Sequence, residues 1–356
     1  MLYSYIVMQL VVLFYSSFTV RRGIVRSSEA LPGVGRNSMK AVFLVLSILL
    51  VLSCEDSTGP SGGGGADELS DVEFWMYQIQ DQHMDGAIEA LGATHYDMLV
   101  IDQTRSIEGE EGWDSAADVE YLQSTGKMVI CYIDVGEAED YRWYWQDGWE
   151  VGNPSWIAGE DPDGWDGNYP VLFWNDDWKA IMAEYLTRII NDGYDGIYLD
   201  WLEVYDFDAV VAAAEVMGQD PEDLLVEYVQ WIEQFVHSRN PDFIIIAQNA
   251  AEMGYRLDYI QVFDGIAQEA IWFDGGGDPD TGDIPGDVAV DPEQTAEYIQ
   301  SLQYWKTAGL PVFNCEYCQE SANTTTAYDN GEQYGYTTLC TLRPLDQVTE
   351  TPPPGY

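Results

Sequence analysis

The chain has 356 residues, of which 46% are hydrophobic, and it carries 62 Asp and Glu against 14 Lys and Arg, a formal net charge of −48. This length suits a large buried core, and about 250 residues is the usual size of one (β/α)₈ barrel. A polyanion of this kind repels nucleic acid and anionic lipid, which excludes both as partners. It attracts cationic substrates, although an acidic surface also suits a protein that works in high salt.

The first 54 residues are predicted to target the chain rather than to fold with the rest of it. The basic residue Lys40 after Met39, a short apolar run over 41–52 and the small residue Ser53 before Cys54 are typical of a bacterial lipoprotein signal peptide. Cys54 is then lipidated, and the mature protein is extracytoplasmic, either membrane-anchored or secreted. The earlier apolar stretch 2–20 is either a transmembrane helix or, more simply, the result of a start assigned upstream of Met39. Residues 55–70, rich in Gly and Ser near their start, predict a flexible tether.

Eight short apolar runs alternate with amphipathic stretches between residues 71 and 345, which is the pattern of repeated βα units. The runs are continuous rather than alternating, as expected for parallel strands that are covered on both faces. They are Phe74–Gln80, Met98–Asp102, Met128–Asp134, Gly196–Asp200, Phe243–Asn249, Gly265–Glu269, Val312–Glu316 and Gly335–Leu342. The sequence therefore predicts an α/β fold, a single (β/α)₈ TIM barrel over residues 71–345, followed by a Pro-rich tail over residues 346–356.

Two of the intervening helices have clear start signals. Asp220 and Asp291 are each followed by Pro and Glu, which places a capping carboxylate before a Pro at the first helical position. After Asp220, apolar residues recur at helical spacing from Leu224 to Val236. No helix is predicted after the eighth strand, so we expect the barrel to be closed there by something atypical.

Polar residues end seven of the eight predicted strands, and in a barrel the carboxyl ends of the strands form the rim of the active site. A single acidic strand end usually caps the next helix, but seven on one rim favour a functional site. They are Gln80, Asp102, Asp134 with Glu137, Asp200, Asn249, Glu269 and Glu316, whereas the eighth strand offers only Arg343.

This rim favours glycoside hydrolysis, which needs two carboxyl groups, one as general acid and the other as nucleophile or base. The chain has 3 His, none at a strand end, so a Ser-His hydrolase is poorly supported. No cofactor and no metal is predicted, since carboxylate metal sites in hydrolases normally add His ligands, and Cys315 with Cys318 forms only half of a zinc pattern. The 13 Trp and 24 Tyr offer flat faces that suit sugar rings, and many lie in one long loop after the third strand.

Several stretches of the chain resemble successive motifs of one family. They are Tyr77–Gln80, Asp97–Asp102, Tyr132–Arg142, Trp165–Tyr169, Gly193–Asp200, Gln248-Asn249 and Gln268-Glu269. Together they resemble glycoside hydrolase family 114, the endo-α-1,4-polygalactosaminidases, over roughly residues 74–320. The resemblance implies a (β/α)₈ fold and endo-hydrolysis of an α-1,4-linked, galactosamine-rich exopolysaccharide, which is cationic where it is de-N-acetylated. It also implies a catalytic pair, an Asp that ends the fourth strand and a Glu that ends the sixth, which fall on Asp200 and Glu269.

We assign Asp200 as nucleophile or base and Glu269 as general acid. The candidate substrate-binding residues are rim acids and polar or aromatic neighbours: Tyr77, Asp102, Asp134, Glu137, Arg142, Trp174, Asn249 and Glu316. Arg142 has an equal alternative role as an ion-pair partner that holds the loop. The Asp- and Gly-rich segment 274–283 is expected to be a solvated loop, with a Ca²⁺ site as the alternative. Two other functions remain open, a non-catalytic glycan-binding lipoprotein and a hydrolase of a different polysaccharide.

Overall fold

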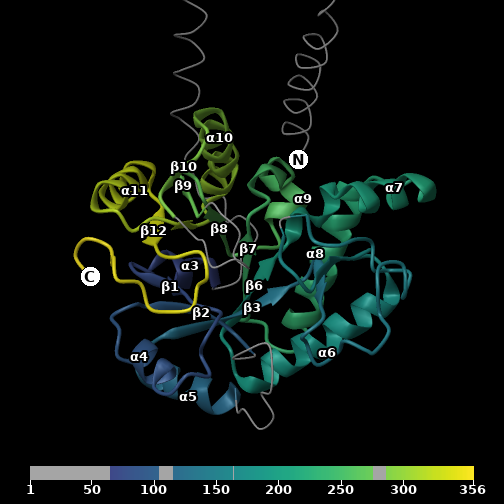
Figure 1. Ribbon diagram of the computed structural model, residues 1–356, viewed down its shortest axis with the longest axis horizontal. Coiled ribbons are helices and arrows are strands. Elements are labelled where there is room, and N and C mark those ends of the chain that lie inside the picture. The colour runs from purple at the N-terminus through teal and green to yellow at the C-terminus, as the bar shows by residue number, and fades with distance from the viewer. Residues whose placement is uncertain (1–64, 104–114, 163, 276–285) are drawn as a thin grey trace, which may run out of the picture. The chain divides into compact units, whose positions relative to one another are not determined.

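Eight parallel strands form the sheet at the centre of the protein (Figure 1). The computed structural model describes residues 65–103, 115–162, 164–275 and 286–356. The predicted signal peptide, the lipidation site Cys54, the stretch 2–20, most of the tether and most of the segment 274–283 lie outside the described residues. Within the described part of the chain, none of the helices is both long and apolar enough to cross a membrane.

The eight predicted strands are confirmed, with the first, fifth and eighth shorter than predicted. In the order in which they pair around the sheet they are β1 (Trp75–Tyr77), β2 (Met98–Asp102), β3 (Met128–Asp134), β6 (Gly196–Asp200), β7 (Ile244–Gln248), β8 (Gly265–Glu269), β11 (Val312–Glu316) and β12 (Thr337–Cys340). Nearly every residue in them is buried, because helices cover one face and the barrel interior fills the other. The chain therefore folds as the predicted TIM barrel.

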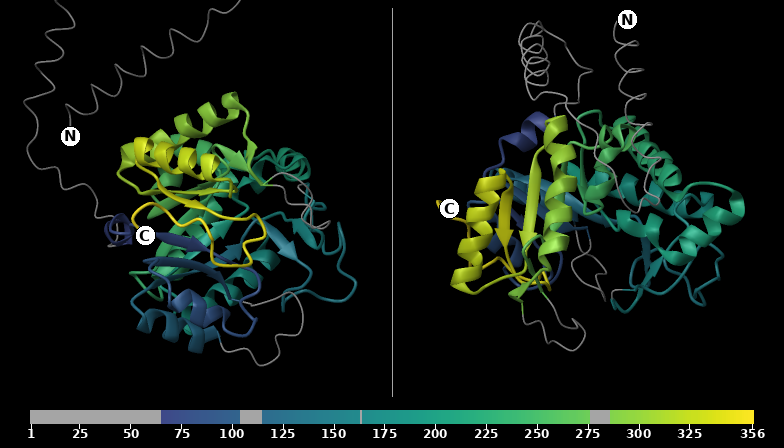
Figure 2. Two further views of the ribbon diagram at one scale, coloured as in Figure 1. Left: turned by 60° about the vertical axis from the view of Figure 1, so that its left-hand side comes forward. Right: turned by 90° about the horizontal axis from the view of Figure 1, so that it is seen from above.

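The helices lie outside the sheet and follow the strands in chain order (Figures 1 and 2). The capping signals at Asp220 and Asp291 are confirmed, since each carboxylate accepts a hydrogen bond from the backbone two residues on, at 3.0 and 2.8 Å. The helical elements are α3 (Gly65–Ser70), α4 (Ala87–Gly92), α5 (Ser115–Ser124), α6 (Asp176–Asp192), η1 (Leu202–Asp206), α7 (Asp208–Met217), α8 (Pro221–His237), η2 (Ala251–Tyr255), α9 (Leu257–Ile260), α10 (Pro292–Ala308) and α11 (Ser321–Tyr334).

The segment after β12 closes the barrel where a helix would follow in a regular repeat. No strand ladder joins β1 to β12 within the described residues, but the Trp75 indole donates to the Thr337 carbonyl at 2.9 Å. Beyond the end of β1, the backbone N–H groups of Ile79 and Gln80 both donate to the Leu345 carbonyl, at 2.9 and 3.0 Å. Figure 2 shows this yellow C-terminal segment beside the purple first strands. It supplies the closure that the sequence left unspecified.

The long loop after β3 is tied together by a small hairpin that the sequence did not predict. Its strands β4 (Glu137–Glu139) and β5 (Asn168–Pro170) pair antiparallel, so the loop leaves and re-enters the barrel at one place. Gly136 precedes β4 and packs against the end of β6, where a Cβ atom would lie 2.0 Å from the Trp201 carbonyl oxygen. Only glycine permits this close approach of two backbones.

The short strands β9 (Phe273–Asp274) and β10 (Val288–Ala289) form a second antiparallel pair beside β8. The buried Cys315, Cys318 and Cys340 near this end of the sheet carry free thiols.

Candidate active site

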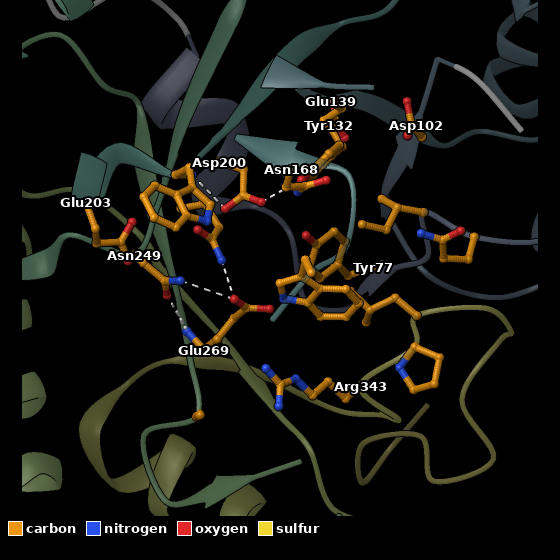
Figure 3. Close-up of a pocket in the computed structure, with 18 of the residues that line it drawn as sticks. Tyr77, Asp102, Tyr132, Glu139, Asn168, Asp200, Glu203, Asn249, Glu269 and Arg343 are labelled. Atoms are coloured by element: carbon orange, nitrogen blue, oxygen red, sulfur yellow. Dashed lines mark hydrogen bonds between the residues drawn. The ribbon is translucent and has the colours of Figure 1, made fainter. Parts of the chain in front are cut away.

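A cavity of about 1170 Å³ opens at the carboxyl ends of the barrel strands (Figure 3). Each of the eight strands contributes a residue at or near its carboxyl end to the lining: Tyr77, Asp102, Tyr132, Asp200, Gln248, Glu269, Tyr317 and Arg343. Ten acidic residues of the described part of the chain line it: Asp81, Asp102, Glu139, Asp166, Asp200, Glu203, Asp206, Asp208, Glu269 and Asp274. Of the strand-end carboxylates predicted from the sequence, Asp102, Asp200 and Glu269 line this acidic cavity, and the other seven acids come from outside the eight barrel strands.

Asp200 ends β6 at the floor of this cavity. Its carboxylate accepts hydrogen bonds from the Tyr132 hydroxyl at 2.6 Å and from the Trp201 backbone N–H at 2.7 Å. Burial, and next the nearby charge of Glu269, raise the pKa of Asp200 to about 7, although both hydrogen bonds favour the ionised form. Asp200 is therefore placed to gain or lose a proton near neutral pH.

Glu269 ends β8 and receives three side-chain donors. Its Oε2 atom accepts from the amides of Gln248 and Asn249, the latter at 3.2 Å, and the Tyr317 hydroxyl donates to its Oε1 atom. Burial raises the pKa of Glu269, while the hydrogen bonds from Tyr317 and Asn249 and the charge of Arg343 oppose that rise. Asn249 is itself fixed, since its Oδ1 atom accepts from the Glu269 backbone N–H at 3.0 Å.

Asp200 and Glu269 therefore form a pair of interacting buried carboxyl groups, and burial raises the pKa of both. A pair with one protonated and one ionised member supplies both the acid and the base or nucleophile of glycoside hydrolysis. Asp200 and Glu269 are the two residues that the sequence predicts as the catalytic pair.

The backbone turns sharply at the ends of these strands. Trp201, Asn249, Ala250 and Ala270 follow β6, β7 and β8, and all four have positive φ angles, between 48° and 57°. Residues other than glycine rarely adopt this left-handed conformation, and such strain is concentrated at functional sites.

The sequence model of Glycoside-hydrolase family GH114 matches residues 66–354, nearly the whole of the barrel and its closing segment. The chain belongs to glycoside hydrolase family 114. An uncharacterized protein of Deinococcus radiodurans is 29% identical over 323 residues, which cover 86% of this chain and 97% of the relative.

Two solved structures share the fold of this family 114 chain. One is Aspergillus fumigatus Ega3 in complex with galactosamine, with a TM-score of 0.55 and 18% identity, covering 82% of this chain and 98% of the other. The second is the glycoside hydrolase domain of PelA from Pseudomonas aeruginosa, with a TM-score of 0.56 and 16% identity, covering 79% of this chain and 98% of the other.

The structure of the family 114 chain places the predicted substrate-binding residues in two groups. Tyr77, Asn249, Asp102 and Arg142 line the cavity. Tyr77 is only 2% exposed and packs against Tyr198, with ring centroids 5.1 Å apart, so it forms the cavity floor rather than an open stacking platform.

Arg142 joins Asp102 to the loop that follows β3. Its guanidinium forms a bidentate pair with Asp102, both N···O distances 2.8 Å, and a second pair with Glu139 at 2.6 and 2.9 Å. All three residues are almost fully buried. Of the two roles that the sequence left open for Arg142, the geometry favours the structural one.

The other four predicted binding residues, Asp134, Glu137, Trp174 and Glu316, lie behind the cavity wall. Asp134 caps a turn by accepting from the Gly136 and Glu137 backbones at 3.0 and 2.7 Å. Glu137 accepts from the Asn168 amide at 3.2 Å across the β4–β5 hairpin. None of the four is among the residues that line the cavity in the described part of the chain.

Glu316 and Trp174 have packing roles instead. Glu316 is fully buried and accepts hydrogen bonds from the backbones of residues 271–273, at 2.6–3.3 Å, and from the Asn314 amide at 2.7 Å. It thereby fixes the turn that follows β8. Trp174 packs edge-on against Phe173, with ring centroids 4.9 Å apart, and contacts the hydrophobic core.

Counting strand ends overlooked several residues that do reach the site. Tyr132, Gln248 and Tyr317 bond directly to the two central carboxylates. Tyr132 and Gln248 lie inside predicted strands, so a rule that selects only the last residue of each strand misses them. Both nevertheless stand within the family motifs. Tyr317 could have been predicted from its position directly after β11, next to the strand-end residue Glu316.

Proposed function

We propose that this chain is an endo-acting hydrolase of an α-1,4-linked, galactosamine-rich polysaccharide, with Asp200 and Glu269 as its catalytic carboxyl pair. The observation that carries this proposal is the interacting pair of buried carboxyl groups on the floor of a cavity with ten acidic residues. A chain that carries ammonium groups is drawn into such a cavity by Coulomb attraction. The galactosamine bound to the structurally similar Ega3 agrees with this substrate class.

In the proposed mechanism Glu269 donates a proton to the leaving oxygen, and Asp200, in its ionised form above its pKa of about 7, acts as nucleophile or base. The Tyr132 hydroxyl and the Trp201 N–H orient Asp200, whereas Gln248 and Asn249 hold one oxygen of Glu269. The Oε1 atom, next to the Tyr317 hydroxyl, is then the oxygen of Glu269 that is available for proton transfer.

The test uses the purified protein with a partly de-N-acetylated α-1,4-galactosamine polymer, and it measures new reducing ends and the lengths of the products. Asp200→Asn and Glu269→Gln should each reduce turnover by at least about a thousandfold while polymer binding persists. The matched controls are Asp329→Asn and Glu332→Gln, the same isosteric changes on α11, which lies outside the cavity, and they should leave activity unchanged.

Three outcomes separate the alternatives. Binding of the polymer without any release of oligosaccharide identifies a glycan-binding protein and refutes the hydrolase. Hydrolysis of chitosan or polygalacturonate but not of the galactosamine polymer identifies a hydrolase of another glycan. If the galactosamine polymer is cleaved, proton NMR of the first product tells whether the anomeric configuration is retained or inverted, and so whether Asp200 is nucleophile or base.

We also propose that the mature protein is extracytoplasmic and is anchored through lipid on Cys54 or secreted. The signal-peptide pattern that ends at Cys54 supports this location. In a bacterial host, the full chain should fractionate with membranes and Cys54→Ser should not become lipidated. Recovery of unprocessed, unlipidated wild-type protein from the cytoplasm would count against the proposal.

A further inference from the structure

Arg343 is an unusual residue in this cavity because it is a cation in an acidic chain and has no carboxylate partner among the described residues. No ion pair within 4.0 Å involves it in that part of the chain, whereas the other cavity arginine, Arg142, is paired twice. The guanidinium instead lies over the indole of Trp165, 5.5 Å from the ring centroid. A guanidinium that faces a cavity without an ion-pair partner is available to a ligand.

Backbone contacts limit where the Arg343 side chain can go. A Cβ atom on Gly275 would lie 2.6 Å from its Cδ atom, so the chain after β8 passes directly against the arginine stem. Figure 3 shows the guanidinium directed toward Glu269, and its charge lowers the pKa of that carboxyl. Arg343 is therefore held beside the catalytic pair rather than out at the rim.

The opposite side of the cavity has different chemistry. There the segment after β6 contributes Glu203, Asp206 and Asp208 together with the aromatic residues Trp201 and Phe207. In the strand order β6 and β12 are four strands apart, which places them across the barrel from each other. One side of the pair thus offers three carboxylates and two aromatic rings. The other offers a guanidinium and an indole, with Asp166 next to Trp165 in the chain and Asp274 next to Gly275.

We propose that Arg343 and Trp165 form a subsite for an N-acetylated galactosamine unit, and that the residues after β6 bind a unit with a free amine. This inference rests on the proposed function. The guanidinium donates to the acetamido carbonyl oxygen and the indole covers the methyl group, whereas an ammonium group is repelled by Arg343. The carboxylates across the barrel attract that ammonium group instead. The enzyme would then prefer to cleave bonds that have an acetylated unit on one side and a unit with a free amine on the other.

The consequence is a fixed pattern in the products. In a randomly half-acetylated polymer, one of the two new chain ends should carry an acetylated unit in most products, and the other should carry a free amine. Tandem mass spectrometry of isotope-labelled reducing ends identifies the unit at each end. If wild-type protein cleaves the polymer and both ends have random acetylation, the subsite does not exist and the proposed hydrolase still stands. If nothing is cleaved, the proposed function fails first.

Substitution of Arg343 tests the residue itself. Arg343→Gln should lower kcat/KM on the half-acetylated polymer by about tenfold or more relative to kcat/KM on the fully de-N-acetylated polymer, the usual effect of losing a hydrogen bond to a charged group. Arg343→Glu should reverse the preference and place a free amine at that end. Arg343→Lys keeps the charge and should still exclude the ammonium group, which checks for loss of folding.

The matched control is Arg188→Gln, which removes an exposed arginine of α6 that does not line the cavity and should alter neither rate nor product ends. Equal losses of rate on both polymers in Arg343→Gln, with product ends as in the wild type, would overturn the assignment of Arg343 to an acetyl-selective subsite.

Discussion

Replacing Asp200 with Asn should stabilise the fold at neutral and alkaline pH while it removes activity. The pKa of about 7 in the folded protein compares with 3.8 for an ordinary aspartate. Between those values the folded protein holds a proton that the unfolded chain has lost, so this group makes stability fall as pH rises. The full difference corresponds to at most about 4 kcal/mol, at about 1.4 kcal/mol per pKa unit.

Asn carries no charge at any pH, so the variant lacks the loss of stability that Asp200 causes as pH rises. Its side chain can still accept from the Trp201 N–H and can donate to the Tyr132 oxygen. From about pH 5 to about pH 8 we therefore expect the stability advantage of Asp200→Asn over the wild type to grow by about 2–3 kcal/mol. Urea unfolding of both proteins at several pH values measures this difference directly.

Asp329→Asn is the control, since Asp329 lies on α11, away from the carboxyl pair, and should show no such pH-dependent gain. Glu269→Gln should reduce the pH dependence that belongs to Asp200, because the charge of Glu269 is one cause of the raised pKa. If the unfolding free energies of Asp200→Asn and the wild type stay parallel across this pH range, the pKa of Asp200 is not raised as described.

Three further variants test parts of the fold that support the site. Arg142→Ala removes the guanidinium that pairs with two buried carboxylates and should cost about 3–5 kcal/mol in urea unfolding, against about 1 kcal/mol or less for the exposed Arg188→Ala. Equal losses would refute the buried network. Glu316→Ala removes the acceptor of four buried N–H donor groups and should cost about 3 kcal/mol or more, seen as a lowered thermal midpoint, and an unchanged midpoint would contradict that role. Gly136→Ala should push the β4 segment off the end of β6 and lower kcat at least about tenfold, and wild-type kinetics would show that the backbones can separate freely.

Local pattern was enough to predict the barrel and its central pair. Continuous apolar runs mark buried parallel strands and their ends mark the rim, so these patterns alone predict Asp200 and Glu269 as rim residues. The family motifs then selected these two from the other strand-end acids. The caps at Asp220 and Asp291 were equally local, because a cap depends on residues within one turn of helix.

Strand ends alone could not tell which polar residue faces the cavity. Asp134 and Glu316 end strands just as Asp200 does, yet their carboxylates turn back to accept backbone N–H groups of neighbouring segments. Whether a strand-end side chain points into the cavity depends on the path of the chain after the strand, and that path is set by contacts between distant segments. Tyr317, one residue past a strand end, reaches Glu269 for the same reason.

Local sequence patterns specify the periodic features of this protein: the number and order of the strands, the helix starts, the acidic character and the pair of carboxyl residues that the family motifs mark. The tertiary structure decided the pairing of Arg142, the closure of the barrel through Leu345 and the placement of Arg343 across from Glu203. These features join segments that lie from about 40 to more than about 200 residues apart in the chain. Periodicity and capping act within a few residues, whereas contacts at such separations exist only once the sheet has brought the strand ends together.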